Sequence, residues 1–152
     1  MKNYIDIIMG VDPGVTTGIC VCSLERGSTN SVLVVIDHAE IEFSSNFRKD
    51  MWHFIHKYIP RVIVMESVVY AGKLNREKVI QIKAEDRLKE LAKNTGFLLM
   101  EVTPEERKRV KEAPKSVSGS HARDAYRAVE SHLRSKGMYD NTHTVSEENE
   151  GR

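Results

Sequence analysis

Three apolar segments rich in β-branched residues follow one another within the first 41 residues, at 5–11, 17–24 and 31–41. Only turn-forming residues separate them, an Asp-Pro-Gly at 12–14 and a polar stretch at 26–30. Connections this short join antiparallel neighbours, since a parallel pair needs a long crossover. The chain is therefore predicted to begin with a three-stranded antiparallel meander.

Beyond the meander, strand and helix patterns alternate. Segment 47–58 has apolar residues at helical spacing and is followed by Pro60, and 61–66 is a short apolar strand. Alternation after an antiparallel meander predicts an α/β fold, a mixed five-stranded sheet (βββαβαβα) flanked by helices. The remaining predicted elements are a charged helix over 76–94, a strand over 97–102, a short polar helix from Pro104 and a last helix over 121–135.

The size and composition of the chain favour a single domain. The chain has 152 residues, of which 40% are hydrophobic, and this is enough to bury a core. No apolar run reaches the roughly 20 residues of a membrane span, and Asp6 interrupts the stretch where a secretory signal would be apolar. We expect an intracellular protein with its domain at 1–136 and a polar, flexible tail at 137–152.

The two cysteines, Cys20 and Cys22, lie on one predicted strand and point to the same face. Residues two apart in a strand have poor disulfide geometry, and no zinc ligands lie nearby at the required spacing. We therefore expect two buried thiols that pack as small apolar groups.

The net charge of +1 conceals an uneven distribution of charge. Basic residues outnumber acidic ones between Tyr70 and Arg123, whereas the tail from Asp140 is mainly acidic. A basic face can bind polyanions through counterion release. The same charges are compatible with an ordinary solvated helix surface, and charge alone does not decide between the two.

Two predicted strands end in a carboxylate. Asp12 closes the first strand and is followed by Pro13-Gly14, which is also common turn chemistry. Glu66 ends an otherwise apolar strand, where an unpaired buried carboxylate would be costly. In the predicted topology the first strand is central and the fourth lies beside it, so the two acids would be adjacent.

The start of the last helix supplies two more polar groups. His121 and Asp124 are three residues apart and therefore share a helix face. A capping arrangement, with Ser120 as the N-cap and Asp124 stabilised by the helix dipole, explains the same pattern without any catalytic role. The helix also carries small residues that would let it lie close to the sheet: Ala122, Ala125 and Ala128.

Three carboxylates in one place repel one another unless cations neutralise them. Hard oxygen ligands favour Mg²⁺ or Mn²⁺. Two such ions about 4 Å apart form the usual clamp for in-line displacement at a phosphodiester. Together, Asp12, Glu66, His121 and Asp124 therefore predict a metal-dependent site of phosphodiester hydrolysis.

Three motifs occur in this order: Asp-Pro-Gly-x-Thr-Thr-Gly at 12–18, Glu66 at a strand end, and His-x-x-Asp at 121–124. With the order of elements, they resemble the RNase H-like nucleases of the RuvC type, especially the compact Holliday junction resolvases of phages. The resemblance covers about 5–135. It implies that the four polar residues are catalytic ligands of two Mg²⁺ ions, which Mn²⁺ can replace. It also implies action on four-way DNA junctions in the cytoplasm of a bacterial cell or phage-infected host.

The resemblance further implies a homodimer, because symmetrical nicks in two strands suit a two-fold assembly. An apolar face of the charged helix could form its interface, but the same face would be core in a monomer. The family carries a Phe three residues after the strand-end Glu, whereas here Val69 holds that place and Tyr70 follows. The residues of the apolar helix face are Ile80, Ala84, Leu88 and Leu91.

Basic residues in two segments are candidates for contacts with DNA phosphates, which position a complex without reading sequence. Tyr70 could stack on an unpaired base or simply pack within its loop. The candidates are Lys73, Arg76 and Lys78 in the first segment, and Arg107, Lys108, Arg109, Lys111 and Lys115 in the second.

The leading hypothesis is a metal-dependent endonuclease that resolves Holliday junctions and other branched DNA. One alternative is a nuclease of the same fold that processes structured RNA, and another is a branched-DNA-binding protein without catalysis. The opening motif also resembles a phosphate loop of actin-like ATPases and sugar kinases. Those proteins enclose a nucleotide between two such lobes, and 152 residues supply only one.

Overall fold

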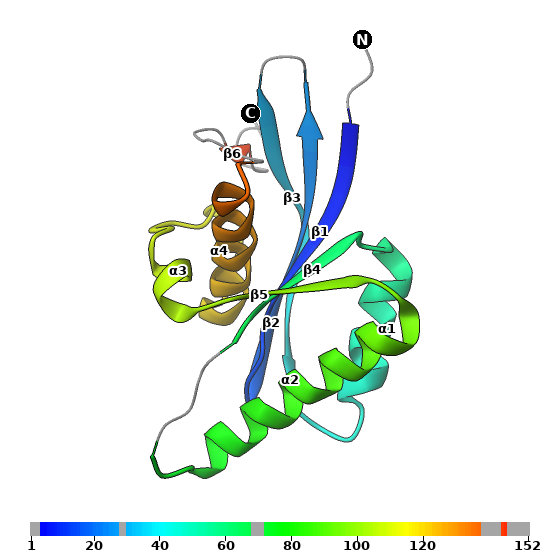
Figure 1. Cartoon of the computed structure of the whole chain (residues 1–152), viewed down its shortest axis with the longest axis vertical. Helices are drawn as coiled ribbons and strands as arrows, with labels where there is room; N and C mark the ends of the chain where they lie inside the picture. The colour runs from blue at the N-terminus through cyan, green and yellow to red at the C-terminus, as the bar shows by residue number, and fades with distance from the viewer. Residues whose placement is uncertain (1–3, 28–29, 68–71, 138–143, 146–152) are drawn as a thin grey trace.

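The computed structural model describes residues 4–27, 30–67, 72–137 and 144–145. In it, long N-terminal strands run beside shorter later ones (Figure 1). The strands are β1 (Tyr4–Asp12), β2 (Thr16–Arg26), β3 (Ser31–Glu42), β4 (Val62–Glu66), β5 (Leu98–Val102) and β6 (Thr144–Val145). The helices are α1 (Phe47–Tyr58), α2 (Arg76–Thr95), α3 (Pro104–Lys108) and α4 (Ser120–Ser135).

The strands form one mixed sheet in the order β5-β4-β1-β2-β3-β6. β1, β2 and β3 are antiparallel neighbours, whereas β4 is parallel to β1 and β5 is parallel to β4. The predicted α/β fold is confirmed. The two-residue β6 is an addition to it, because it lies in the predicted tail and pairs in parallel with β3 at Leu33 and Val34. Most of that tail lies outside the described residues.

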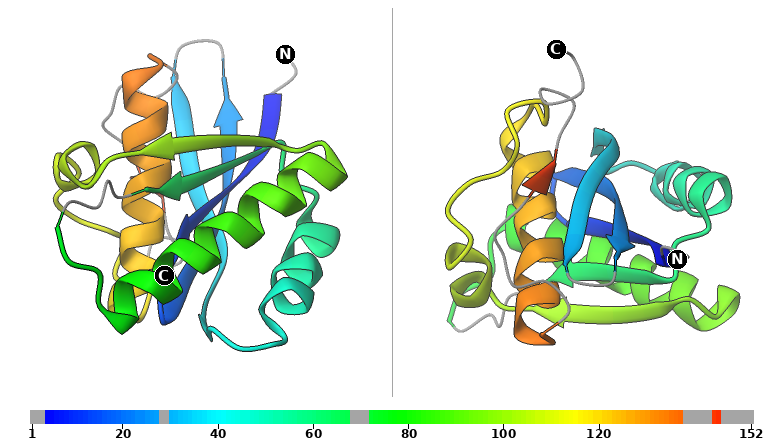
Figure 2. Two further views of the ribbon diagram at one scale, coloured as in Figure 1. Left: turned by 60° about the horizontal axis from the view of Figure 1, so that its bottom comes forward. Right: turned by 90° about the horizontal axis from the view of Figure 1, so that it is seen from above.

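The two faces of the sheet are covered by different helices (Figure 2). α4 packs on one face, and α1 and α2 pack on the other. Side chains alternate between the faces along each strand. Thus Ile8 and Val64 belong to the core on the α4 side, whereas Met9, Ile63 and Met65 belong to the core under α1 and α2. The sheet is therefore buried on both sides.

The apolar face of α2 is part of this core. Ala84 and Leu88 are fully buried, Leu91 is nearly so, and Ile80 is half-buried. Ala84, Leu88 and Leu91 pack on the sheet together with Met51 of α1. Of the two interpretations of this face, the structure therefore selects monomer core, and an interface with a second copy would have to lie elsewhere.

Local sequence signals set both ends of α2 and the start of α3. Asn75 caps α2 by accepting a backbone hydrogen bond of 2.8 Å, and Gly96 ends that helix with a left-handed φ of 86°. Thr103 and Glu106 form a capping box around the start of α3, with Pro104 in its first turn. These positions agree with the predicted helix over 76–94 and with the predicted start of the short helix at Pro104.

Two other expectations concern the cysteines and membranes. Cys20 and Cys22 are fully buried, as predicted, and their Sγ atoms lie 3.8 Å apart, too far for a disulfide bond. Among the helices of the described residues, none has both the length and the apolar character of a membrane span.

Candidate active site

Asp12 and Glu66 lie side by side at the ends of two neighbouring parallel strands. β1 and β4 are paired up to Val11 and Met65, so each carboxylate directly follows a paired residue. Alternation places both acids on the face of Val64, which is the α4 side of the sheet. Their exposed fractions are only 8% and 6%. Two buried carboxylates therefore meet at this edge, as predicted.

The first half of α4 approaches this edge closely because only glycine and alanine lie at the contact between helix and sheet. A Cβ atom on Gly18 would lie 2.0 Å from the backbone oxygen of His121, and one on Gly10 would lie 2.1 Å from that of Ala125. Both distances are far below van der Waals contact, so both positions require glycine. Ala122 and Ala125 are fully buried. Small residues on the helix were predicted to permit this approach, and glycines of the strands complete it.

The first turn of α4 brings His121 and Asp124 to the strand ends. Nδ1 of His121 lies 3.3 Å from Oδ2 of Asp12, and the imidazole is 44% exposed. All four residues predicted to be catalytic, Glu66 included, line one open hollow of about 650 Å³. The structure thus brings these residues together, and their catalytic and metal-binding roles stay predictions.

Arg107 of α3 bridges two of the acids. Its Nε–H donates to Oε1 of Glu66, and its Nη1 lies 3.4 Å from Oδ1 of Asp124. Arg127, on the same helix as Asp124, also donates to Oδ1 from 3.3 Å. The Arg107 side chain is only 15% exposed. Sequence reasoning places Arg107 among the phosphate contacts, whereas its partners here are carboxylates of the site.

The crowding of acids acts most strongly on Asp12. Burial, and then the charge of Glu66, raises the pKa of Asp12 from its usual 3.8 to about 7, and the hydrogen bond with His121 offsets this only in part. At Arg107 burial acts to lower the pKa, but the hydrogen bond and charge of Glu66 outweigh it, and the pKa is raised. A cation bound near Asp12 would relieve this excess of negative charge.

The N-terminus of α4 is capped by a residue of β3. Oε2 of Glu40 accepts hydrogen bonds from the backbone N–H groups of His121 (2.8 Å) and Ala122 (3.3 Å). Gly119 occupies the N-cap position with a φ of 91°, and no side chain at that position caps the helix. The interpretation with Ser120 as N-cap is therefore wrong. Sequence reasoning missed Glu40, because it lies 81 residues from His121 and carries no local signal.

Thr17 closes the turn that follows Asp12. Its Oγ1 donates to the backbone oxygen of Gly14 and accepts from the backbone N–H of the same residue, both at 3.2 Å. Thr17 is fully buried. The second threonine of the Asp-Pro-Gly-x-Thr-Thr-Gly motif therefore shapes the loop that borders the hollow.

The segment between α3 and α4 is attached to the start of α4. The guanidinium of Arg123 donates to the backbone oxygens of Ala113, Pro114 and Val117 at 3.0–3.2 Å. Ala113 and Val117 are buried. The segment has no regular secondary structure, and these hydrogen bonds tie its backbone to the first turn of α4.

The donor set suits a hard divalent cation. Asp12, Glu66 and Asp124 offer carboxylate oxygens, His121 offers an imidazole nitrogen, and the raised pKa of Asp12 reflects uncompensated negative charge. Within the described residues, no three such groups already surround a common point. The guanidinium of Arg107 contacts both Glu66 and Asp124. By the chemistry of their donor atoms, the four residues fit Mg²⁺ or Mn²⁺.

The first group of predicted phosphate contacts lies at the start of α2. Arg76 is exposed and lines the same hollow as Asp12. Lys73 is exposed just before the helix, and Lys78 is half-buried within it. Tyr70, with the neighbouring Val69, lies outside the described residues.

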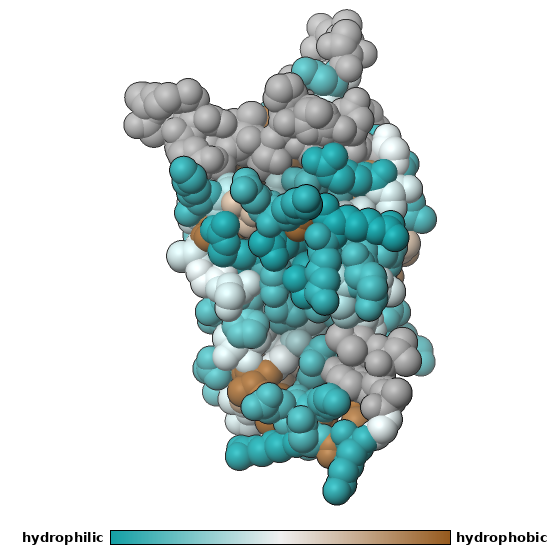
Figure 3. All heavy atoms as spheres, turned by 90° about the vertical axis from the view of Figure 1, so that its left-hand side faces the viewer, coloured by the Kyte–Doolittle hydropathy of each residue, from teal (hydrophilic) through white to brown (hydrophobic). Residues whose placement is uncertain are grey.

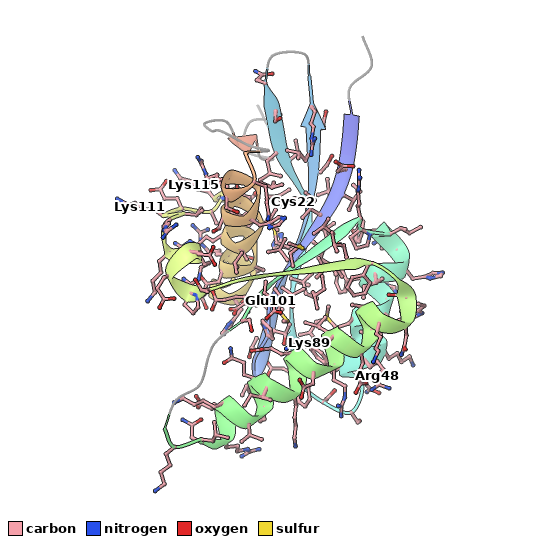
Figure 4. The ribbon with its side chains drawn as sticks, viewed as in Figure 1. Cys22, Arg48, Lys89, Glu101, Lys111 and Lys115 are labelled. Carbon is pink, nitrogen blue, oxygen red and sulfur yellow. The ribbon has the colours of Figure 1, made fainter. Side chains whose placement is uncertain are left out.

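The second group lies along α3 and the segment after it. Arg109, Lys111 and Lys115 line a second hollow, of about 700 Å³, together with Arg134 of α4. Lys108 is exposed at the end of α3. This side of the molecule is mainly hydrophilic (Figure 3), and Lys111 and Lys115 project outward from it (Figure 4). Sequence reasoning missed Arg134, because only the packing of α4 brings its last turns to this hollow.

Neither a family model nor a curated protein matches the sequence. Solved structures do match the fold. RuvC of Thermus thermophilus superposes with a TM-score of 0.69 at 15% identity, covering 87% of this chain and 97% of RuvC. The chain has the RuvC fold. The same RuvC in complex with a Holliday junction substrate gives an equal TM-score and coverage at 16% identity.

The structure also matches that of a viral protein. The fowlpox virus Holliday junction resolvase has a TM-score of 0.59 at 14% identity, and the match covers 85% of this chain and 99% of that one. The predicted resemblance to RuvC-type proteins is thus confirmed at the level of architecture. At such identities the likeness concerns the path of the chain, and the chemistry has to be argued from the site.

Proposed function

We propose that this chain is a metal-dependent endonuclease that cuts Holliday junctions or related branched DNA by phosphodiester hydrolysis. The observation that carries the proposal is the convergence of Asp12, Glu66, His121 and Asp124 on one hollow of a RuvC fold. Solved proteins of this fold include Thermus thermophilus RuvC and the fowlpox virus resolvase, each in complex with a Holliday junction. An acidic site in the same architecture is suited to the same class of substrate.

Each residue of the site has a role that its position supports. Asp12, Glu66 and Asp124 would hold two Mg²⁺ ions, which Mn²⁺ would replace. Such ions polarise a phosphodiester and lower the pKa of an attacking water. His121 is nearly half exposed with Nδ1 toward Asp12, so its ring can act as a further ligand or accept the proton of that water.

The basic residues would hold the DNA backbone around this site. Arg76 borders the hollow itself, and Arg109, Lys111 and Lys115 line the second hollow beside α4. Contacts of this kind orient a substrate by its phosphates and are independent of base sequence. DNA of a bacterial cell or of a phage-infected host, in the cytoplasm, would be the substrate.

We also infer a two-fold homodimer, because resolution of a junction requires symmetrical nicks in two strands. The apolar face of α2 cannot supply the interface, since it packs on the sheet. Light scattering on the purified protein measures the mass directly, and we expect twice the chain mass of 17.3 kDa. A mass of one chain, with and without junction DNA, would contradict the dimer.

The decisive experiment compares substrates with and without Mg²⁺. A four-way junction, a fork, a flap, a linear duplex and a structured RNA are each incubated with the protein in Mg²⁺ or in EDTA. We expect paired nicks in the junction in Mg²⁺ only. Cleavage of the RNA with an intact junction would favour the RNA-processing alternative. Junction binding without cleavage in any metal would indicate a non-catalytic branched-DNA-binding protein.

A further inference from the structure

We propose that Arg107 is the internal counter-cation of the acidic site, and that its guanidinium must leave Glu66 and Asp124 before a divalent cation can bind there. This inference rests on the metal site of the proposed function. It adds a residue that controls how readily that site is loaded.

Arg107 meets acids from two other elements. Its Nε–H donates to Glu66 at the end of β4, and its Nη1 lies 3.4 Å from Oδ1 of Asp124 on α4. All three side chains are largely buried, and Glu66 most of all. The attraction between opposite charges is stronger where water is excluded, and removal of one partner leaves an uncompensated buried charge. The guanidinium therefore neutralises the two acids within the site.

The backbone of α3 fixes the starting point of this side chain. A capping box of Thr103 and Glu106 holds the single turn of α3, and Oγ of Ser131 on α4 donates to the backbone oxygen of Glu106 at 3.0 Å. Lys108 and Arg109 follow directly but are exposed, and Arg109 lines the second hollow instead. Among these three consecutive basic residues, Arg107 is the one directed to the acids.

A divalent cation bound by Glu66 and Asp124 would compete with Arg107 for Oε1 of Glu66 and Oδ1 of Asp124. A divalent ion bound to Glu66 and Asp124 would lie against the guanidinium in a largely buried place, where like charges repel strongly. The ion must therefore replace the hydrogen bonds of Arg107, and this exchange lowers its net affinity. The flexible stem of Arg107 allows it to swing outward, where a released guanidinium would meet a phosphate. The predicted phosphate contact and the observed ion pairs then describe two states of one side chain.

The first test measures binding of Mn²⁺ alone to the full chain, without DNA, by titration calorimetry. The variants are Arg107→Gln, which removes the competing charge, and Arg127→Gln as the matched control. Arg127 carries the same charge and also donates to Asp124, but no contact joins it to Glu66 in the described structure. We expect Arg107→Gln to lower the Kd for Mn²⁺ about tenfold and Arg127→Gln to lower it about threefold or less.

A second readout follows Arg107 in the wild-type protein, so that it does not depend on how the variants fold. The Nε–H signal of Arg107 in ¹⁵N NMR spectra, assigned by its absence in Arg107→Lys, should be sharp and protected without metal. Added Mg²⁺ should shift it and make it exchange with water, because the bond to Glu66 is broken.

Two results would overturn the proposal, and they differ in what else they affect. If Mn²⁺ binds the wild type and both variants equally well and the Arg107 signal is unchanged by Mg²⁺, Arg107 does not compete with the metal, and the metal site stands. If neither the wild type nor Arg107→Gln takes up Mn²⁺, the metal site of the proposed function fails as well.

Discussion

Near the site the sheet meets the first half of α4 through glycine and alanine, whereas under α1 and α2 it is covered by large side chains. A Cβ atom on Gly10 or Gly18 would strike the backbone of α4, while Met9 packs in a layer with Met51 and Leu88. The difference follows from chemistry. The side chains of Asp12 and Glu66 are short, so the helix that completes the site must come close to the strands. Helices with only a packing role need no such approach.

The largest expected effect concerns two acids at opposite ends of one strand. Asp12 and Asp6 both lie on β1 and are largely buried. Their side chains point to the same face of the sheet, because an even number of residues separates them. Asp12→Asn should lower the rate of junction cleavage by on the order of 10³-fold, because it removes a metal ligand, while junction binding survives. Single-turnover cleavage and gel-shift binding measure the two quantities.

Asp6→Asn is the matched control. Asp6 pairs with Arg26 and Arg61 at the end of the strand away from the hollow, so its loss should leave the cleavage rate within a few-fold of wild type. Equal cleavage by Asp12→Asn and wild type would remove Asp12 from the catalytic site.

Substitutions to alanine on the two faces should also differ in their effect on cleavage. Leu88→Ala opens a cavity under α2 and should cost about 2–5 kcal/mol in the free energy of unfolding, yet the folded fraction should still cleave. Gly18→Ala forces α4 away from the sheet and should cost about 1–3 kcal/mol or more, and in addition abolish cleavage. Urea unfolding and cleavage at a temperature where each variant is folded separate the two effects. Full cleavage by folded Gly18→Ala would contradict the need for close approach.

The crowded acids should make the metal-free fold sensitive to pH. Burial raises the pKa of Asp12 to about 7, so the folded protein holds this proton more tightly than the unfolded chain does. This contribution to stability is complete below about pH 4 and is lost as pH rises through 7. Asp12→Asn should therefore gain about 1–3 kcal/mol over wild type between pH 5 and pH 8, measured by urea unfolding in EDTA. If the difference in unfolding free energy between Asp12→Asn and wild type stayed constant across this range, the pKa of Asp12 would not be raised by folding.

The smallest expected effect concerns the cap of α4. Glu40 accepts from the backbone of His121 and Ala122, whereas Glu42, two residues along the same strand, accepts from the side chain of Thr16. Glu40→Ala should cost about 1 kcal/mol in the free energy of unfolding and lower the cleavage rate, because the first turn of α4 frays. Glu42→Ala is the control and should cost less than about 0.5 kcal/mol. Equal losses in both variants would mean that Glu40 does not cap the helix.

Much of the fold could be predicted because the signals are local. Each signal acts within a few residues: the β-branched segments, the helix end before Pro60, the left-handed cap at Gly96 and the capping box at Thr103. The structure places the strands and helices close to the positions that these signals indicate. The sheet order also followed, since a meander joined to a later parallel strand leaves few topologies. The two-residue β6 could not be predicted, because nothing in its own sequence sets it apart.

The sequence by itself determined which acids end the central strands and which helix carries His121 and Asp124, because strand alternation and helical spacing are properties of neighbouring residues. Only the tertiary structure decided that Arg107 faces Glu66 and Asp124 rather than solvent, and that Glu40 caps α4 in place of Ser120. These contacts join residues between 17 and 81 positions apart. The sequence does not reveal whether the partner of a charged side chain is water, a phosphate or a buried carboxylate, because tertiary packing determines which group lies beside it.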